Sequence, residues 1–422
     1  MSANRAMHDV STGASGPAGK GRLDRIVVAH AATYGGMLTN FGRLFAEKVV
    51  EEGGQLHFFA STTPICGSPP PTNEFSEIGG DFHGLKIPRL PSPILDLLAV
   101  IKMASELRRL KVQVLHTRSS LMGVLGGIAA RLAHVPVIIH HQDDLYSRIG
   151  KLSPTARWLV GRIELAVSAL SHVSMFISSA VLRDALKLGF NPQRCLNVGL
   201  DLNPVLRDAA LRASPRDGAK HPLLRALGIP ESALVVGSLG RLVAEKGFDT
   251  LLRVAKKVCA ESPDCYFVIR GDGPLRPALE AMISESGLTG RLFLCAERLP
   301  RDEVPLLYKS FDVFVLPTRR EGFGMVFAEA MALGVPVVGP NVEPVTEVVG
   351  PGCGILVEPE DVEQYSGAIL RLLQDAALRH GMGEAARKYA LKTWGGEAAA
   401  DRVIQVYCDL IRSRGLGVGA AA

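Results

Sequence analysis

Residues 313–332 read VFVLPTRREGFGMVFAEAMA and carry the clearest strand–loop–helix pattern in the chain. The apolar run Val313–Pro317 is followed by a short polar loop, and the loop leads into a segment with the composition of a helix. Buried strands that alternate with helices build parallel α/β sheets. The stretch therefore predicts one strand–helix unit of such a sheet.

The same alternation extends over both halves of the chain. In the first half, strands are predicted at Arg25–His30, Gln55–Ala60, Val112–His116, Val135–His140 and Val173–Ile177, and helices at Leu38–Glu52, Ile94–Leu110 and Leu121–Ala133. In the second half, strands are predicted at Leu234–Leu239, Cys265–Arg270, Arg291–Cys295, Val313–Pro317, Val335–Val338 and Gly354–Val357. Because 422 residues exceed one ordinary domain, we expect two Rossmann-like domains, each with a parallel sheet.

The domain boundaries follow from breaks in this alternation. The boundary between the domains is expected near Asn197–Asn203. There, Val198-Gly199-Leu200-Asp201 leads into a segment that extends to Pro222, is rich in Arg, Pro and Asp, and has the composition of an exposed linker. The expected organisation is a disordered tail over residues 1–22, a first Rossmann-like domain over 23–198, a second over 199–392, a helix over 393–414 that packs on the first domain, and a mobile tail over 415–422. The proline-rich segment Ser61–Pro93 is too long for a plain connection and is expected to be a functional loop.

The overall composition narrows the class of protein. The net charge is only +5 and no long block of like charges occurs, which argues against a nucleic-acid-binding protein. The most apolar stretch, Leu121–Ile139, is interrupted by Arg131 and Pro136 and falls short of a membrane span. Residues 1–22 lack the apolar core of a signal peptide. A cytoplasmic protein is expected, with contact to the anionic inner face of a membrane left open.

Two glycines and two glutamates in the quoted stretch indicate a ligand site. The backbone N–H groups at the start of the predicted helix are free, and Gly322 and Gly324 permit close approach, so this turn favours phosphate. Glu321 and Glu329 would repel an anion but can accept hydrogen bonds from hydroxyl groups. The alternative is that Glu321 caps the helix and Glu329 is solvated. The combination of all four residues after a buried strand favours the ligand site.

A basic motif follows another predicted strand, where residues 240–248 read GRLVAEKGF. Arg241 offers a planar fork for phosphate oxygens, and Lys246 offers a compact positive charge. Two cations and a helix start, which is equivalent to about half a charge, come close to neutralising a diphosphate. Alternatively, both are ordinary surface residues. On the first interpretation neither a metal nor another cofactor is required.

Two glycine-containing turns follow predicted strands. Gly271, Asp272 and Gly273 form one of them, and Gly35 and Gly36 form the other. Ligands of open α/β sheets bind at the carboxyl ends of the strands. Each turn by itself is only a turn, but its position makes it a candidate for phosphate contact.

Polar residues also follow the strands of the first half. His116 ends one predicted strand, and His140, His141, Asp143 and Asp144 come after another. Any of these side chains could orient a substrate or accept a proton. The alternative is a structural role, which is more common for a histidine at a strand end. Asp143 and Asp144 alone supply too few hard ligands for a metal site.

A basic stripe with interleaved apolar residues runs through residues 146–164. Its members are Arg148, Lys151, Arg157 and Arg162, with Leu152, Trp158, Leu159 and Ile163 between them. The near-helical spacing is typical of a solvated helix face. The alternative is a surface patch for an anionic lipid or a polyanionic acceptor.

Together these motifs resemble glycosyltransferase family 4. The resemblance rests on Gly240-Arg241-x4-Lys246-Gly247, Gly271-Asp272-Gly273-Pro274 and Glu321-Gly322-Phe323-Gly324-x4-Glu329-Ala330-Met331-Ala332-x-Gly334-x-Pro336. It extends from about residue 25 to residue 411 and is looser in the first half. The resemblance implies the GT-B fold, in which two Rossmann-like domains face each other across a cleft. It also implies retaining, metal-independent transfer of a sugar from a nucleotide-diphosphate-sugar donor to an acceptor hydroxyl.

The resemblance implies roles for individual residues as well. Arg241 and Lys246 would hold the diphosphate, Glu329 the ribose, and Glu321 with the neighbouring amides the donor sugar, while the acceptor enters through the first domain. The candidate donor-binding residues are Gly35, Gly36, Arg241, Lys246, Gly271, Asp272, Gly273, Glu321, Gly322, Phe323, Gly324, Met325, Val326 and Glu329. The candidate catalytic residues are Glu321, Lys246, Arg241, His116, His141 and Asp143.

The sequence departs from the family pattern at three places. His140-His141-Gln142-Asp143 replaces the usual Thr-x-His, so Asp143 or a neighbouring histidine represents the family's active-site histidine. Cys295-Ala296-Glu297 stands where the family has Gly, beside the expected base pocket, and Glu343-Pro344 replaces a Gly-Gly pair.

The sequence leaves the substrates and two other functions open. A lipid-linked acceptor at the inner membrane face and a small-molecule acceptor are both compatible with it, in the biosynthesis of a surface polysaccharide, a glycolipid or a glycosylated metabolite. A nucleotide-sugar epimerase of the same fold is an alternative function. A catalytically silent nucleotide-sugar-binding partner of another enzyme is a second one.

Overall fold

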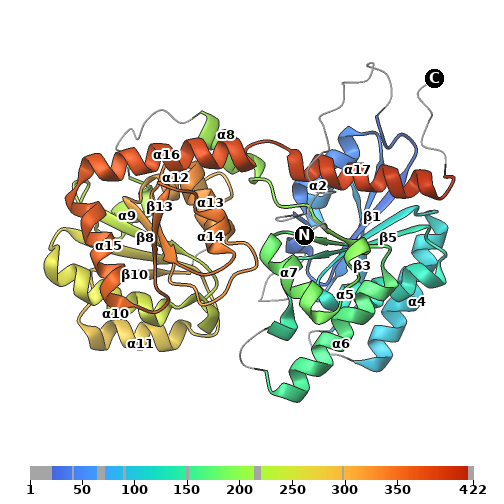
Figure 1. Cartoon of the computed structure of the whole chain (residues 1–422), viewed down its shortest axis with the longest axis horizontal. Coiled ribbons are helices and arrows are strands. Elements are labelled where there is room, and N and C mark those ends of the chain that lie inside the picture. The colour runs from blue at the N-terminus through green and yellow to red at the C-terminus, as the bar shows by residue number, and fades with distance from the viewer. Residues whose placement is uncertain are drawn as a thin grey trace, which may run out of the picture.

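The computed structural model describes residues 21–39, 42–63, 72–88, 92–148, 152–212, 220–296 and 299–416. Residues 1–20 and 417–422, which make up most of the two expected tails, lie outside this part of the chain. Two α/β domains lie side by side, and the last helix crosses from the second domain back to the first (Figure 1). The two predicted Rossmann-like domains are confirmed.

The first domain contains a seven-stranded parallel sheet in the order β3-β2-β1-β4-β5-β6-β7, as far as the described residues show. Its strands are β1 Val27–Ala32, β2 Gln55–Ser61, β3 Asp81–Leu85, β4 Val114–Arg118, β5 Val137–Gln142, β6 Val173–Phe176 and β7 Cys195–Asn197. The central strands β1, β4 and β5 are almost entirely buried, and β4 and β5 begin with apolar residues and end in the polar residues 116–118 and 140–142.

Helices cover both faces of this sheet. They are α1 Gly35–Thr39, α2 Arg43–Glu51, α3 Thr72–Ile78, α4 Pro93–Arg109, α5 Ser120–Leu132, α6 Pro154–Leu170 and α7 Ser179–Leu188, with short 3₁₀ turns η1 Tyr146–Arg148 and η2 Pro192–Arg194. Figure 1 shows α2 on one side of the sheet and α4, α5 and α6 on the other. Right-handed crossovers place helices on opposite faces when the strand order reverses its direction across the sheet. Here successive strands move towards one edge from β1 to β3 and towards the other edge from β4 to β7, so the two sets of helices cover opposite faces.

The second domain repeats the architecture with six parallel strands in the order β10-β9-β8-β11-β12-β13 within the described ranges. The strands are β8 Leu234–Leu239, β9 Cys265–Arg270, β10 Leu292–Cys295, β11 Val313–Val315, β12 Val337–Pro340 and β13 Gly354–Val357. The helices are α8 Pro204–Leu211, α9 Pro222–Ala226, α10 Phe248–Glu261, α11 Arg276–Ser286, α12 Val304–Lys309, α13 Met325–Ala332, α14 Val345–Val348, α15 Val362–Gln374 and α16 Ala376–Trp394, with the 3₁₀ turn η3 Ala244–Lys246.

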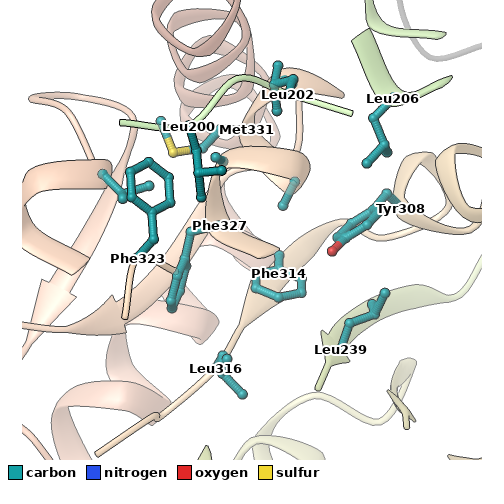
Figure 2. Close-up of a cluster of buried hydrophobic side chains, with 14 of the residues drawn as sticks. Leu200, Leu202, Leu206, Leu239, Tyr308, Phe314, Leu316, Phe323, Phe327 and Met331 are labelled. Atoms are coloured by element: carbon teal, nitrogen blue, oxygen red, sulfur yellow. The ribbon is translucent and has the colours of Figure 1, made fainter. Parts of the chain in front are cut away.

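The segment between the domains is packed, so the prediction of an exposed linker is wrong for its described part. Leu200, Leu202 and Leu206 are buried in the same apolar cluster as Phe323 and Met331 (Figure 2). The leucines of this segment provide the apolar surface, and Asp201 between two of them is also buried, where it accepts hydrogen bonds from the backbone N–H groups of Ala399 and Ala400. The linker therefore extends the core of the second domain towards the first.

The predicted glycine turn after β1 is also wrong. Gly35 and Gly36 are the first residues of α1, and the predicted helix Leu38–Glu52 corresponds to α1 followed by α2. A Cβ atom on Gly36 would lie 2.5 Å from the Tyr34 ring, so packing against this ring accounts for a glycine here.

The segment Ser61–Pro93 contains regular structure where a functional loop was predicted. Residues 72–78 form α3 and residues 81–85 form the edge strand β3, whereas 64–71 and 89–91 lie outside the described residues. β3 pairs with β2, with Phe82 opposite Phe58. Its sequence DFHGL has little strand propensity, so the pairing with β2 decides its conformation.

The last helix, α17 (Ala398–Ser413), packs on α2 of the first domain (Figure 1). Lys48 of α2 lies 2.7 Å from Glu397, just before α17. Inside the contact, the Tyr407 hydroxyl lies 3.1 Å from Nε2 of His30 and 2.5 Å from Nδ1 of His116. Burial lowers the pKa of both histidines, to about 3 for His30, so both are neutral. A single hydroxyl can then donate to one ring and accept from the other.

No helix in the described ranges combines the length and the apolar character that a bilayer crossing requires.

Replacing Tyr407 by Phe should lower the free energy of unfolding by about 1–3 kcal/mol, because two buried imidazole nitrogens lose their partner. Urea unfolding followed by circular dichroism measures the change. Tyr389→Phe, on α16, is the matched control and should change the free energy by less than about 0.5 kcal/mol. Equal losses in both variants would contradict the bridging role of the Tyr407 hydroxyl.

Candidate functional site

A cavity of about 260 Å³ lies between the domains at the start of α13. The first domain and the linker line it with Met37, Asp143, Asp144, Ile177 and Leu200. The second domain lines it with Lys246, Glu321, Gly322, Phe323, Gly324, Met325 and Val326. Seven of the predicted donor-binding residues therefore come together in one cavity.

The two positions of the loop before α13 that are occupied by glycine require it for different physical reasons. Gly324 has a φ of 93° and precedes the first residue of the helix, and this left-handed conformation favours glycine. Gly322 lies against the first domain, where an added Cβ atom would be 2.3 Å from the backbone oxygen of Asp143. The hydroxyl of Ser178 donates a hydrogen bond of 2.9 Å to the backbone oxygen of Gly322. The loop is thus shaped by contact with the other domain.

Lys246 and Glu321 form an ion pair inside this cavity. The Nζ atom of Lys246 lies 2.6 Å from Oε1 of Glu321, and the glutamate side chain is only 8% exposed. Arg319 fixes the loop that carries the lysine, because it donates to the backbone oxygen of Ala244 at 2.6 Å and to both carboxylate oxygens of Asp249. The position of Lys246 is therefore set by the same strand–loop unit that carries Glu321.

A second cavity of about 240 Å³ continues from the first and contains Glu329. The two cavities share Leu200 and Met325. Oε2 of Glu329 accepts a hydrogen bond of 2.7 Å from the Tyr308 hydroxyl. Burial raises the pKa of Glu329 to about 7, and the bond from Tyr308 opposes this rise. Glu329 is therefore a cavity residue, and its alternative interpretation as a solvated helix residue is wrong.

Arg241 and the turn Gly271–Gly273 lie at the carboxyl ends of neighbouring strands, outside the lining of the two cavities. The backbone N–H of Leu242 donates 2.9 Å to the oxygen of Asp272, which joins the two loops. Arg241 is exposed. Burial raises the pKa of Tyr146 in the first domain, and the positive charge of Arg241 opposes that rise. Arg241 thus stands at the rim of the cleft.

Asp143 and Asp144 each pair with an arginine. Arg118 lies 2.6 Å from Asp143, and its guanidinium is 2% exposed and stacks 5.5 Å above the Phe45 ring. Arg320 of the second domain lies 2.5 Å from Asp144. Burial raises the pKa of Asp144, and Arg320 partly offsets this effect. Within the described residues, no group of three or more His, Cys, Asp or Glu side chains is arranged to hold a metal ion.

A small cavity of about 50 Å³ adjoins the first one and shares Met37, Asp143 and Asp144 with it. It is also lined by Ser120 and His141. The Ser120 hydroxyl, both ring nitrogens of His141 and Oδ2 of Asp143 are buried without a hydrogen-bond partner among the described residues. Burial lowers the pKa of His141 well below its usual value, so the ring is neutral. These atoms can together donate to and accept from a hydroxyl group.

His116, a candidate catalytic residue, is not among the residues that line the three cavities. It is buried under α17, where it binds Tyr407 and stacks on His141 with ring centroids 5.3 Å apart. This position favours a structural role. Gly35 and Gly36 do not line the cavity themselves, but they directly precede Met37, which does.

Sequence reasoning missed Arg118, Arg320 and Tyr308. The predicted strand ended at His116, whereas β4 continues to Arg118, so the carboxyl end of the strand was placed two residues early. Glu343 and Glu347 also have a role that the family pattern does not indicate, because both pair with Arg183 of α7, at 2.5 and 2.9 Å, and so connect the domains.

Two Rossmann-like domains with this site in the cleft between them form the GT-B fold. Among solved structures, Anabaena HepE in complex with UDP and glucose has a TM-score of 0.75 at 17% identity, over 92% of this chain and 100% of that one. Two family profiles match the sequence, Glycosyltransferase Family 4 over residues 40–198 and Glycosyl transferases group 1 over residues 220–389.

The sequence is also similar to known sugar transferases along most of its length. It is 30% identical over 364 residues to the GDP-mannose-dependent alpha-mannosyltransferase of Corynebacterium glutamicum, which covers 81% of this chain and 80% of that protein. It is 26% identical over 340 residues to the UDP-Gal:alpha-D-GlcNAc-diphosphoundecaprenol alpha-1,3-galactosyltransferase of Escherichia coli, which covers 76% and 81%. The chain belongs to glycosyltransferase family 4 and is an enzyme that transfers a sugar.

The raised pKa of Glu329 should make stability depend on pH. The folded carboxyl keeps its proton up to about pH 7, whereas the unfolded one loses it near 4.5, so the free energy of unfolding falls as the pH rises between these values. Glu329→Gln cannot ionise. It should nearly match the native protein at pH 4.5 and exceed it by about 3 kcal/mol at pH 7 and above. Urea unfolding at both pH values measures this, and a pH-independent difference would contradict the assignment.

Proposed function

We propose that this enzyme transfers a sugar from a nucleotide-diphosphate-sugar donor to an acceptor hydroxyl, with retention of anomeric configuration and without a metal ion. The observation that carries the proposal is the Lys246–Glu321 pair at the start of α13, in a cavity that continues to Glu329. A cation and free helix amides suit a diphosphate, and the two carboxylates suit hydroxyl groups.

The two connected cavities fit the parts of such a donor. The ribose would bind Glu329, the diphosphate would lie at the Gly322–Gly324 amides with Lys246 and Arg241, and the sugar would contact Glu321. When the donor binds, Lys246 exchanges its bond to Glu321 for phosphate oxygens, and the carboxylate turns to sugar hydroxyls. The complex of HepE with UDP and glucose and the GDP-mannose-dependent relative support a UDP- or GDP-linked donor.

The rate of the reaction depends on how well the enzyme stabilises the negative charge that develops on the leaving diphosphate. The bond between the anomeric carbon and the diphosphate oxygen breaks, and Lys246, Arg241 and the start of α13 stabilise the negative charge that develops. The acceptor oxygen bonds to the same face of the sugar, and its proton passes to the departing phosphate oxygen. Asp143 and His141 border the place where the acceptor arrives and would orient its hydroxyl.

A lipid-linked acceptor fits best. The E. coli relative is named for transfer to a sugar on diphosphoundecaprenol, which is such an acceptor. The small cavity with Ser120, His141 and Asp143 has unpaired donors and acceptors for one sugar hydroxyl. We therefore place the enzyme in the biosynthesis of a surface polysaccharide or glycolipid, on the inner face of a membrane.

Lys246→Ala should lower kcat/KM, and the change should correspond to a transition-state barrier that is higher by about 2–4 kcal/mol, as expected for the loss of a charge-stabilising donor. Nucleotide release from the donor measures the rate. Lys256→Ala, an exposed lysine on α10, is the control and should retain full activity. Normal turnover in the Lys246 variant would show that this lysine does not stabilise the leaving group.

A panel of nucleotide sugars identifies the donor and tests the reaction type. One UDP- or GDP-sugar should raise the melting temperature and, with an acceptor present, release nucleotide at an increased rate. Proton NMR of the product should show the anomeric configuration of the donor, and an inverted product would overturn the retaining mechanism. Conversion of the donor sugar without any acceptor would identify an epimerase instead.

A further inference from the structure

Exposed apolar side chains are concentrated on one helical layer of the first domain. Ten of the sixteen exposed large hydrophobic residues in the described ranges belong to α4, α5 and α6. They are Ile94, Leu95, Leu97, Leu98 and Ile101 on α4, Ile128 and Leu132 on α5, and Trp158, Leu159 and Ile163 on α6. We name these ten residues the α4–α6 surface. Single exposed apolar residues are ordinary, whereas their concentration on one layer of a protein indicates an interaction site.

The first half of α4 has an unusual sequence for a surface helix. Residues 93–101 read PILDLLAVI, and Ile94 is 73% exposed and Leu97 59% exposed. The acid in this run, Asp96, accepts a hydrogen bond of 2.9 Å from the backbone N–H of Ser92 at the start of the helix. Its charge is therefore directed to the helix end, and the outward side of these turns is almost entirely aliphatic.

The outward side of α6 combines apolar and cationic residues. Trp158 is 68% exposed, and Arg157 and Arg162 flank it on the same helix. The acid of this helix, Glu164, is buried and accepts hydrogen bonds from Tyr146 and Ser147. Neither arginine has an ion-pair partner in the part of the chain that the structure describes. The exposed side of α6 is therefore positive as well as apolar.

The three helices form one continuous layer. α5 packs against both α4 and α6, and Figure 1 shows this layer on the side of the sheet opposite α2 and α17. All three helices follow strands of a parallel sheet, so they begin at its carboxyl edge, which faces the cleft. The apolar starts of α4 and α6 thus lie on the side of the molecule where the cleft opens.

We propose that the α4–α6 surface docks the enzyme on an anionic lipid bilayer, with its aliphatic residues and Trp158 in the headgroup region and Arg157 and Arg162 at the lipid phosphates. Interfacial helices bind by this combination of apolar area and cations, because the apolar side chains leave water and the cations are attracted to the anionic surface. A second copy of the chain fits less well, because a symmetric contact would bring the same arginines together.

The biological purpose of this docking rests on the proposed function, because docking would bring the enzyme to a lipid-linked acceptor. Docking would place the mouth of the cleft beside the membrane, where a lipid-linked acceptor presents its sugar. The contact itself depends on the surface chemistry alone, and so it can be tested without knowledge of the donor or the acceptor.

Co-sedimentation with vesicles tests the docking surface in the full chain. The native protein should bind vesicles of phosphatidylcholine with phosphatidylglycerol and bind pure phosphatidylcholine more weakly. The double variant Leu98→Ser/Trp158→Ser should bind about tenfold or more weakly, because two apolar anchors are lost. The control Leu211→Ser/Leu306→Ser removes two leucines of the second domain that are 61% and 52% exposed, and it should bind like the native protein.

Absence of vesicle binding by the native protein, or equal loss in both double variants, would overturn the proposal. Size-exclusion chromatography tests the alternative occupant of this surface. If the native protein is a dimer and the Leu98→Ser/Trp158→Ser variant is a monomer, the surface binds a second copy of the chain and the proposal is wrong. Thermal stabilisation by UDP or GDP should be the same in both variants. Vesicle binding without stabilisation by either nucleotide would refute the proposed function and leave the docking surface intact.

Discussion

The ion pair between Lys246 and Glu321 can form only because two loops at the carboxyl edge of one sheet are held together. Arg319 connects them, since it follows β11 in sequence and binds the backbone of η3 and the carboxylate of Asp249. Burial around this pair strengthens its electrostatic interactions relative to water. The same strengthening would apply to a diphosphate at the start of α13. The charge chemistry of the site thus depends on a hydrogen-bonded loop junction.

The first domain completes the site by close contact. The backbone of Asp143 meets Gly322 without room for a side chain, and Arg320 and Arg183 connect the domains through partly exposed carboxylates. Arg118 pairs with Asp143 from inside the first domain. Behind this pair, α17 fills the far side of the sheet and binds two neutral histidines through Tyr407. The last helix therefore supports the first-domain side of the cleft from a distance.

Prediction from sequence succeeded where a residue pattern is local. Strand–helix alternation gave both sheets, and the Glu321–Glu329 spacing placed both carboxylates along one cleft, because each sits on or beside a single short helix. It failed where packing decides. The glycine pair after β1 is helical, the linker leucines are buried, and β3 is a strand because β2 pairs with it. His116 lies under Tyr407, 291 residues away in sequence, and no local signal could reveal that contact.

The sequence by itself determined the two-domain α/β architecture and the family, since both follow from periodicity and from motifs confined to a few consecutive residues. Only the tertiary structure decided which polar side chains face the cleft. Arg118, Asp143, Asp144 and Arg320 come from three separate segments, and their pairing depends on how the sheets and domains pack. The physical reason is that ion pairing and burial are properties of distances in space, which neighbouring residues in sequence do not fix.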